Sequence, residues 1–150
     1  MDIAVETLIP HRDRMALIEE ILDADEQSCT TAATVRESWP LFAGGTIDAL
    51  VLVELVAQTA CAGGGWKKLR EGKALGGGWL VGLRNVEFYE ERVALQTRLI
   101  THTVNLYSLD DYHVFEGTVM AGSEMICRMT MQALRNDEFK TEGETSRGDE

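Results

Sequence analysis

One carboxylate lies in the middle of an apolar segment of this chain. Residues 47–61, IDALVLVELVAQTAC, are apolar at most positions, but Glu54 interrupts the run and Gln58 follows four residues later. Burying a carboxylate among apolar side chains costs several kcal/mol unless the group is paired or protonated. A protonated carboxyl group in such surroundings can serve as a general acid, and Gln58 could hold it by a hydrogen bond. The alternative is a structural, protonated glutamate bonded to the backbone or to Gln58.

Three histidines could supply a catalytic base. His102 and His113 lie in segments with a strand pattern, where a structural role is the expected one. His11 lies in the segment IPHRDRM and is the candidate base by its position. The equally weighted alternative is that His11 caps the first strand and bonds to the backbone.

The apolar segment is predicted to be a helix, because it is too long for a typical strand and is rich in Ala and Leu. Thr46 is the expected N-cap, and Asp48 suits the positive end of the helix dipole. Gly63–Gly65 are expected to end the helix, since glycine is unfavourable in a helix interior. A basic segment with helical potential, residues 66–75, and a glycine loop at 76–78 complete this region.

Most of the remaining chain has strand patterns. Strands are predicted at 29–35, 79–89, 94–107, 112–121 and 124–134, while the pattern at 15–23 fits a helix or a strand. In the last strand Met125, Cys127, Met129 and Met131 alternate with polar residues, which is typical of a half-buried antiparallel strand. One helix with an antiparallel sheet predicts an α+β fold in which a curved sheet wraps the long central helix. A short helix is expected within residues 1–14. Residues 1–136 are predicted to form one domain and residues 137–150 a polar, flexible tail.

The composition excludes several classes of partner. The formal net charge is −11 and the sequence pI about 4.7, which argues against binding nucleic acid or anionic membrane surfaces. The three cysteines are scattered, so we interpret them as reduced thiols of a cytoplasmic protein, and expect neither a metal site nor a cofactor. The predicted helix is too short to be inserted in a membrane, and the acidic N-terminal residues do not resemble a secretion signal.

Three segments resemble the 3-hydroxyacyl-[acyl-carrier-protein] dehydratases, a hotdog-fold family (FabA/FabZ-like). Residues 8–12, LIPHR, followed by MALI at 15–18, resemble the family's LPHR opening into the first strand. Residues 53–58, VELVAQ, resemble the E-x-x-A-Q signature of the hotdog helix, and residues 81–88, VGLRNVEF, resemble the third-strand segment. The resemblance covers about residues 7–135 and favours a strand at 15–23.

The loop before the helix departs from the family pattern. Standard members carry a catalytic histidine in a G-H-F-P loop, whereas residues 38–45 here are SWPLFAGG. Asp48 and Ala49 also replace the P-G pair that precedes the helix signature. The chain is more similar to the divergent ApeP-like branch from aryl polyene clusters, which keeps the PH…M opening and the helix signature but lacks the histidine loop.

The resemblance implies dehydration of 3-hydroxyacyl thioesters of acyl carrier protein or CoA to trans-2-enoyl thioesters, in fatty-acid-like or polyene biosynthesis. The reaction needs a base at C2, an acid at the C3 hydroxyl and donors at the thioester oxygen. Glu54 is the expected acid and His11 the expected base. The expected substrate-binding residues are Gly44 and Gly45, through their N–H groups, together with Gln58, Phe42 and Leu83. Standard members take acid and base from opposite subunits, which implies at least a homodimer.

Two other functions stay open at this point. A hotdog acyl-thioester hydrolase would use a lone helix carboxylate to activate water or attack the thioester. A non-catalytic hotdog subunit would have lost its base and would pair with an active partner. Cationic side chains could also meet the phosphate of a carrier, although a solvated charged segment is the simpler interpretation; they are Lys67, Lys68, Arg70, Lys73 and Arg84.

Overall fold

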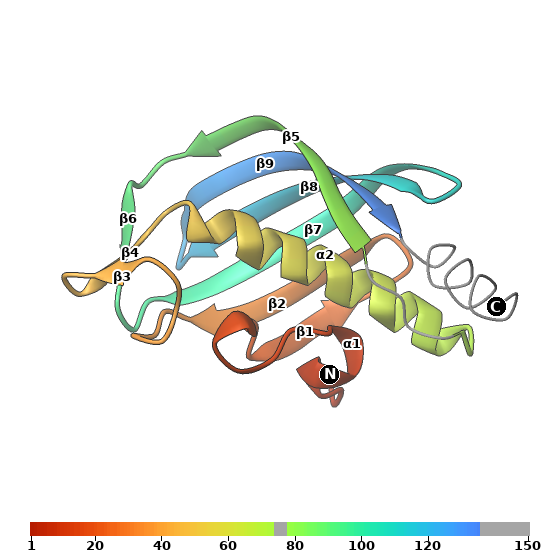
Figure 1. Cartoon of the computed structure of the whole chain (residues 1–150), viewed down its shortest axis with the longest axis horizontal. Coiled ribbons are helices and arrows are strands. Elements are labelled where there is room, and N and C mark those ends of the chain that lie inside the picture. The colour runs from red at the N-terminus through yellow and green to blue at the C-terminus, as the bar shows by residue number, and fades with distance from the viewer. Residues whose placement is uncertain (74–77, 136–150) are drawn as a thin grey trace, which may run out of the picture.

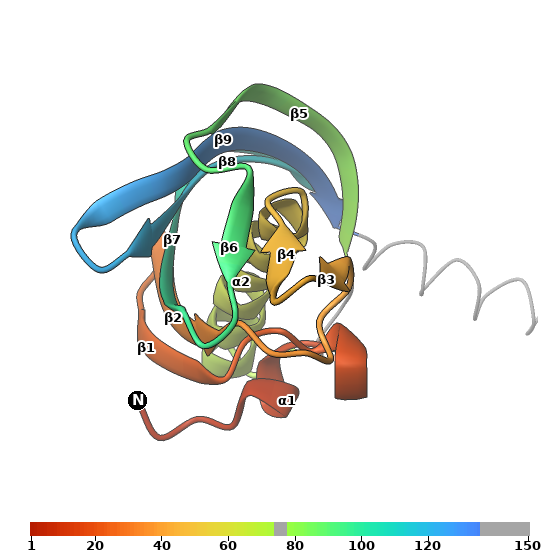
Figure 2. The same cartoon turned by 90° about the vertical axis from the view of Figure 1, so that its left-hand side faces the viewer.

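A six-stranded antiparallel sheet curls around one long helix. The computed structural model describes residues 1–73 and 78–135. The elements are α1 (Val5–Leu8), the 3-10 turn η1 (Asp13–Met15), β1 (Glu20–Ala24), β2 (Ser28–Thr34), β3 (Phe42–Ala43), β4 (Thr46–Asp48), α2 (Val51–Arg70), β5 (Gly78–Phe88), β6 (Arg92–Ala94), β7 (Arg98–Leu109), β8 (Tyr112–Ala121) and β9 (Glu124–Arg135). The large sheet has the order β1-β2-β7-β8-β9-β5, and its curvature around α2 is visible in Figures 1 and 2. The predicted α+β fold, with a long central helix and a curved antiparallel sheet, is confirmed.

A second, three-stranded sheet was not predicted. It has the order β3-β4-β6 and lies at the N-terminal end of α2 (Figure 2). Strands of two or three residues are too short to carry a periodic pattern, so they could not be predicted from the sequence. The segment predicted as one strand at 94–107 is divided, because Gln96 has a φ of 71° between β6 and β7.

The core lies between α2 and the concave face of the large sheet. Leu52, Leu55 and Val56 on α2 are fully buried there. Gly117 on β8 allows this packing, because a Cβ atom at that position would overlap the Val56 side chain. Burial of such apolar side chains is the main favourable term in folding. It explains why the helix and the long strands could be predicted from the pattern of apolar residues.

The helix is longer than predicted and begins later. Thr46 belongs to β4 and is not the N-cap, and the Asp48 side chain accepts a hydrogen bond from Leu50 N at 2.8 Å just before α2 starts. The glycines at 63–65 lie inside α2 instead of ending it. Gly63 lies against Cys29 of β2, and a Cβ at Gly65 would overlap the Leu8 carbonyl oxygen. The close packing at these positions therefore compensates for the low helix propensity of glycine.

The N-terminal part of the chain has both predicted features. The expected short helix is α1, which packs against α2. The ambiguous segment at 15–23 contains no α-helix; it begins at the last residue of η1 and enters β1, which forms an antiparallel hairpin with β2. The predicted tail at 137–150, and Gly76 and Gly77 of the predicted loop, lie outside the described residues.

The last strand alternates as predicted except at its start. Cys127, Met129 and Met131 are buried, whereas Met125 is exposed. The register between β8 and β9 shifts at this point, since Val119 pairs with Cys127 but Met120 pairs with Met125. The irregularity moves Met125 off the buried face.

No helix within the described ranges is long and apolar enough to cross a membrane.

Candidate active site

Glu54 lies on a half-exposed strip of α2 and not in the sealed core that the sequence suggested. Val53, Ala57 and Cys61 share this strip, while the opposite face of the helix is buried in the sheet. The Glu54 side chain is 40% exposed. The carboxyl group therefore combines access from outside with apolar neighbours, in the first turn of α2, where the helix dipole favours a negative charge.

His11 reaches Glu54 from the N-terminal segment of the same chain. Its Nε2 atom lies 3.3 Å from Glu54 Oε1, and its side chain is 27% exposed. The packing of Leu8 against Gly65 fixes the start of this approach, because the chain then runs from Leu8 through Pro10 to His11. The contact joins two of the predicted site residues, which are far apart in sequence.

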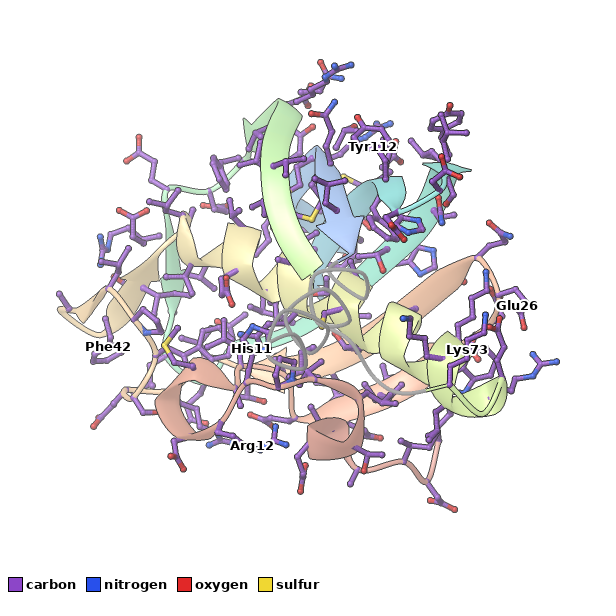
Figure 3. All side chains as sticks on the ribbon, turned by 45° about the vertical axis from the view of Figure 1, so that its right-hand side comes forward. His11, Arg12, Glu26, Phe42, Lys73 and Tyr112 are labelled. Atoms are coloured by element: carbon purple, nitrogen blue, oxygen red, sulfur yellow. The ribbon has the colours of Figure 1, made fainter. Side chains whose placement is uncertain are left out.

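Arg12 holds the backbone around His11. Its guanidinium donates to Ile9 O and His11 O, both at 2.7 Å, and to Glu6 O at 2.9 Å. Glu6 lies in α1, and Ile9 and His11 follow its end, so these carbonyl groups would otherwise lack helical partners. Arg12 and His11 are labelled together in Figure 3. The only indication of this role in the sequence was the position of Arg12 beside His11.

Gln58 connects the carboxyl group to the backbone of the N-terminal segment. Its side chain is fully buried, and its Oε1 accepts a hydrogen bond from Leu17 N at 2.9 Å. Its Nε2 donates to Met15 O at 2.5 Å and to Glu54 Oε1 at 3.0 Å. Gln58 thus contacts Glu54 as expected from the four-residue spacing, and it also anchors the segment that carries His11.

The other predicted site residues are not gathered around Glu54. Gly44 and Gly45 have φ angles of 61° and 79° and form the exposed two-residue turn between β3 and β4. They therefore do not stand at the N-terminus of α2, which was the reason for assigning them to the thioester oxygen. Phe42 on β3 packs against the core, and Leu83 lies 40% exposed on the edge strand β5.

Three of the five cations considered for carrier binding have acidic partners within the chain. Arg70 pairs with Glu26 at 2.7 Å, Lys67 approaches the same carboxylate at 3.9 Å, and Lys73 pairs with Glu71 at 2.9 Å. Figure 3 shows Glu26 and Lys73 at the opposite end of α2 from Phe42. These pairs support the interpretation of a solvated charged segment.

The remaining candidate groups have structural surroundings. Burial raises the pKa of the thiols of Cys29 and Cys127 to about 12, which leaves no nucleophilic thiolate at neutral pH. His102 lies within hydrogen-bonding distance of Thr30, and His113 of Ser108. Within the part of the chain that the structure describes, no three His, Cys, Asp or Glu side chains gather as a metal site would require. Acid–base chemistry is a reaction type that the geometry at Glu54 permits.

The fold and this site define a hotdog protein with a helix carboxylate. One similar solved structure is the dehydratase heterocomplex ApeI:P from Xenorhabdus doucetiae, with a TM-score of 0.84 and 18% identity over 90% of this chain and 92% of that one. Another is Cj0977, a sigma28-regulated virulence protein from Campylobacter jejuni, with a TM-score of 0.69 and 12% identity over 89% and 87%. A hypothetical thioesterase with coenzyme A from Streptococcus pneumoniae has a TM-score of 0.59 and 14% identity over 77% and 84%. At these identities the likeness establishes the fold.

A family model assigns the chain to one family of hotdog proteins. The ApeP-like model, described as ApeP dehydratase, matches residues 3–143, and the chain belongs to this family. The predicted dehydratase-type lyase, and its placement in the ApeP-like branch, are confirmed. No match was found among the curated proteins.

Proposed function

We propose that this dehydratase acts on 3-hydroxyacyl thioesters and that Glu54, His11 and Gln58 form its active site. The observation that carries the proposal is the 3.3 Å contact between His11 Nε2 and Glu54 Oε1. Elimination of water needs proton transfers at two neighbouring substrate atoms, C2 and the C3 oxygen, and a carboxyl–imidazole unit on one side can serve both. The apolar strip beside Glu54 offers Val53 and Ala57 as packing partners for an acyl chain.

The carrier of the acyl group is proposed to be acyl carrier protein or CoA. The family assignment supports polyene biosynthesis as the setting, with fatty-acid-like biosynthesis as the broader class. Lys67 and Arg70 near the C-terminal end of α2 already pair with Glu26, and both carriers have to be tested. A cytoplasmic location stays a prediction from the scattered cysteines.

The active form is proposed to be a homodimer or a higher homo-oligomer. The large sheet ends on β5, whose outer edge has no neighbouring strand within the described residues. Leu80, Val81 and Leu83 on this strand are 46%, 50% and 40% exposed. An exposed apolar edge strand is a surface on which another chain commonly pairs. Because the similar ApeI:P structure is described as a heterocomplex, a different hotdog chain is the alternative partner.

One assay distinguishes dehydration from thioester hydrolysis. The full-length protein is given 3-hydroxyacyl and saturated acyl thioesters on both carriers, while enoyl absorbance and released thiol are followed together. We expect enoyl product from the 3-hydroxyacyl substrate, and a fall of about 10²–10⁴-fold in Glu54→Gln, which removes the proton-transferring group. Glu37→Gln is the matched control, because Glu37 is exposed and lies outside the site.

The other outcomes have clear meanings. Thiol release without enoyl product, lost in Glu54→Gln, would replace the dehydratase proposal with a thioester hydrolase. No product from either carrier would contradict activity of this chain alone and would favour a subunit that needs a different hotdog partner.

A further inference from the structure

The hydrogen bonds of Gln58 fix which of its ends faces Glu54. Its Oε1 accepts from Leu17 N, a backbone group that can only donate, and its Nε2 donates to Met15 O, which can only accept. The group that Gln58 presents to Glu54 Oε1 is therefore an N–H donor, at 3.0 Å. It follows that Glu54 Oε1 acts as an acceptor, which is the behaviour of a carboxylate oxygen or of the carbonyl oxygen of a carboxylic acid.

The surroundings of His11 fix its proton in turn. Nε2 lies 3.3 Å from the same Oε1, and Nδ1 is buried with no hydrogen-bond partner among the described residues. A lone pair at Nε2 would face the lone pairs of an oxygen that already accepts from Gln58. It would also place the ring's N–H at buried Nδ1, where no acceptor lies among the described residues. A neutral ring with its proton on Nε2 avoids the facing lone pairs, and it leaves an acceptor and not an N–H buried at Nδ1.

His11 therefore has no lone pair that a substrate can reach in this arrangement. Nε2 directs its proton to Glu54, and Nδ1 is buried. The second carboxyl oxygen, Glu54 Oε2, has no partner among residues 1–73 and 78–135, and the side chain is 40% exposed. We propose that Glu54 Oε2 makes both proton transfers of the dehydration and that His11 is a positioning residue. This inference rests on the proposed function and revises the expectation that His11 is the base.

The proposed reaction balances without any further reactant. The Glu54 carboxylate takes the C2 proton on Oε2, and the electron pair of the broken C–H bond delocalises onto the thioester oxygen as an enolate. The enolate then forms the C2–C3 double bond while the C3–O bond breaks. Oε2 returns the proton to the departing hydroxyl, which leaves as water. The carboxylate is restored, and His11 and Gln58 hold Oε1 throughout. Both transfers occur on one face of the substrate, so the elimination is syn.

The placement of the His11 proton can be measured without any turnover. Full-length protein with ¹⁵N-labelled histidine gives two-bond ¹H–¹⁵N correlations that distinguish the two neutral ring forms and the doubly protonated ring. The His11 signals are identified by their loss in His11→Gln, with His102 and His113 remaining. We expect a neutral His11 protonated on Nε2. A ring protonated on Nδ1 would overturn the proposal, and so would a doubly protonated ring, which could itself donate.

Matched variants test the division of roles in catalysis. The amide of His11→Gln can replace the N–H donor but cannot act as a base, whereas His11→Phe removes both. We expect kcat of His11→Gln to stay within about tenfold of wild type and His11→Phe to lose about tenfold more, because only the donor is needed. Glu54→Gln should lose about 10²–10⁴-fold.

The contrary results are distinguishable from a failure of the proposed function. Equal losses in His11→Gln and Glu54→Gln, with both variants folded, would make His11 a proton-transferring residue and overturn the inference. A wild-type protein without enoyl product would refute the dehydration itself, and that result needs no variant. Equal kcat losses in His11→Gln and His11→Phe would also contradict a role as donor.

Discussion

At the scale of single residues, the site depends on one buried amide. Gln58 satisfies a backbone donor at Leu17, a backbone acceptor at Met15 and the carboxyl group of Glu54. Its position four residues after Glu54 was readable from the sequence, because helix geometry places such pairs on one face. Its two backbone partners were not readable, since they lie more than 40 positions away along the chain and carry no side-chain signal.

Gln58→Met should weaken both the fold and the site. Methionine fills a similar volume but removes the partner of Leu17 N, which is buried, and that of Met15 O, whose hydrogen bond is partly buried. A buried group left unpaired costs about 1–3 kcal/mol. We expect a loss of at least about 2 kcal/mol in the free energy of unfolding, measured by urea titration. Gln27→Met is the control, because Gln27 is exposed at the β1–β2 turn, and its effect should stay within about 0.5 kcal/mol. An equal effect of both variants would contradict the role of Gln58.

Two cysteines should be chemically inert in the folded protein. Burial raises the pKa of Cys29 and Cys127 to about 12, and only the thiolate reacts with alkylating reagents. At pH 8 we expect iodoacetamide to leave both residues unmodified in native protein and to modify both in urea, as mapped by peptide mass spectrometry. Rapid labelling of native Cys29 would contradict its burial.

The same two thiols give a pH dependence of stability with a definite sign. The folded state holds their protons more tightly than the unfolded state, whose thiols have the ordinary pKa of 9.0. Their contribution to stability is therefore complete below pH 9.0 and is lost as the pH rises towards 12. Urea titrations at pH 8 and pH 10 should show the lower free energy of unfolding at pH 10.

At the scale of elements, the apolar pattern predicted the helix and the long strands, whereas tertiary packing determined where the helix ends. The long strands and the helix were predictable because burial imposes a period on apolar residues. The end of α2 was predicted wrongly, because Gly63 and Gly65 serve close packing against Cys29 and Leu8 and not termination. Gly44–Gly45 were placed at the helix N-terminus because the two-residue and three-residue strands around them have no pattern. The contact of His11 with Glu54 depends on this tertiary packing, so the sequence supplied its members but not its geometry.

Gly65→Ala tests whether the packing of α1 on α2 positions the site. Alanine favours a helix interior by about 1 kcal/mol, but its Cβ would overlap the Leu8 carbonyl oxygen. We expect a net loss of about 1–3 kcal/mol in the free energy of unfolding. We also expect a lower kcat, because His11 lies only three residues after Leu8 and would be displaced with it. Leu69→Ala, at an exposed position of the same helix, is the control. Increased stability in Gly65→Ala, with unchanged kcat, would refute this coupling.

At the scale of the whole molecule, the exposed apolar edge of the large sheet at β5 is the feature that a single chain does not explain. Val81 on β5 is 50% exposed, and Leu106 on β7 is 55% exposed. The two residues are similarly apolar and accessible, but only Val81 belongs to an edge strand, whereas β7 lies between β2 and β8. Apolar side chains on an unpaired edge favour association with a second chain, which completes the hydrogen bonding of the edge.

This difference between Val81 and Leu106 gives a matched test of assembly. We expect wild-type protein to sediment as two or more chains in analytical ultracentrifugation, and Val81→Asp to shift it towards the monomer, because a charge on the shared edge must be desolvated on association. Leu106→Asp should leave the sedimentation unchanged. If Val81→Asp also lowers kcat while the monomer remains folded, the second chain contributes to catalysis. A wild-type monomer that forms a complex only with a different hotdog chain would replace the homodimer with a heterocomplex.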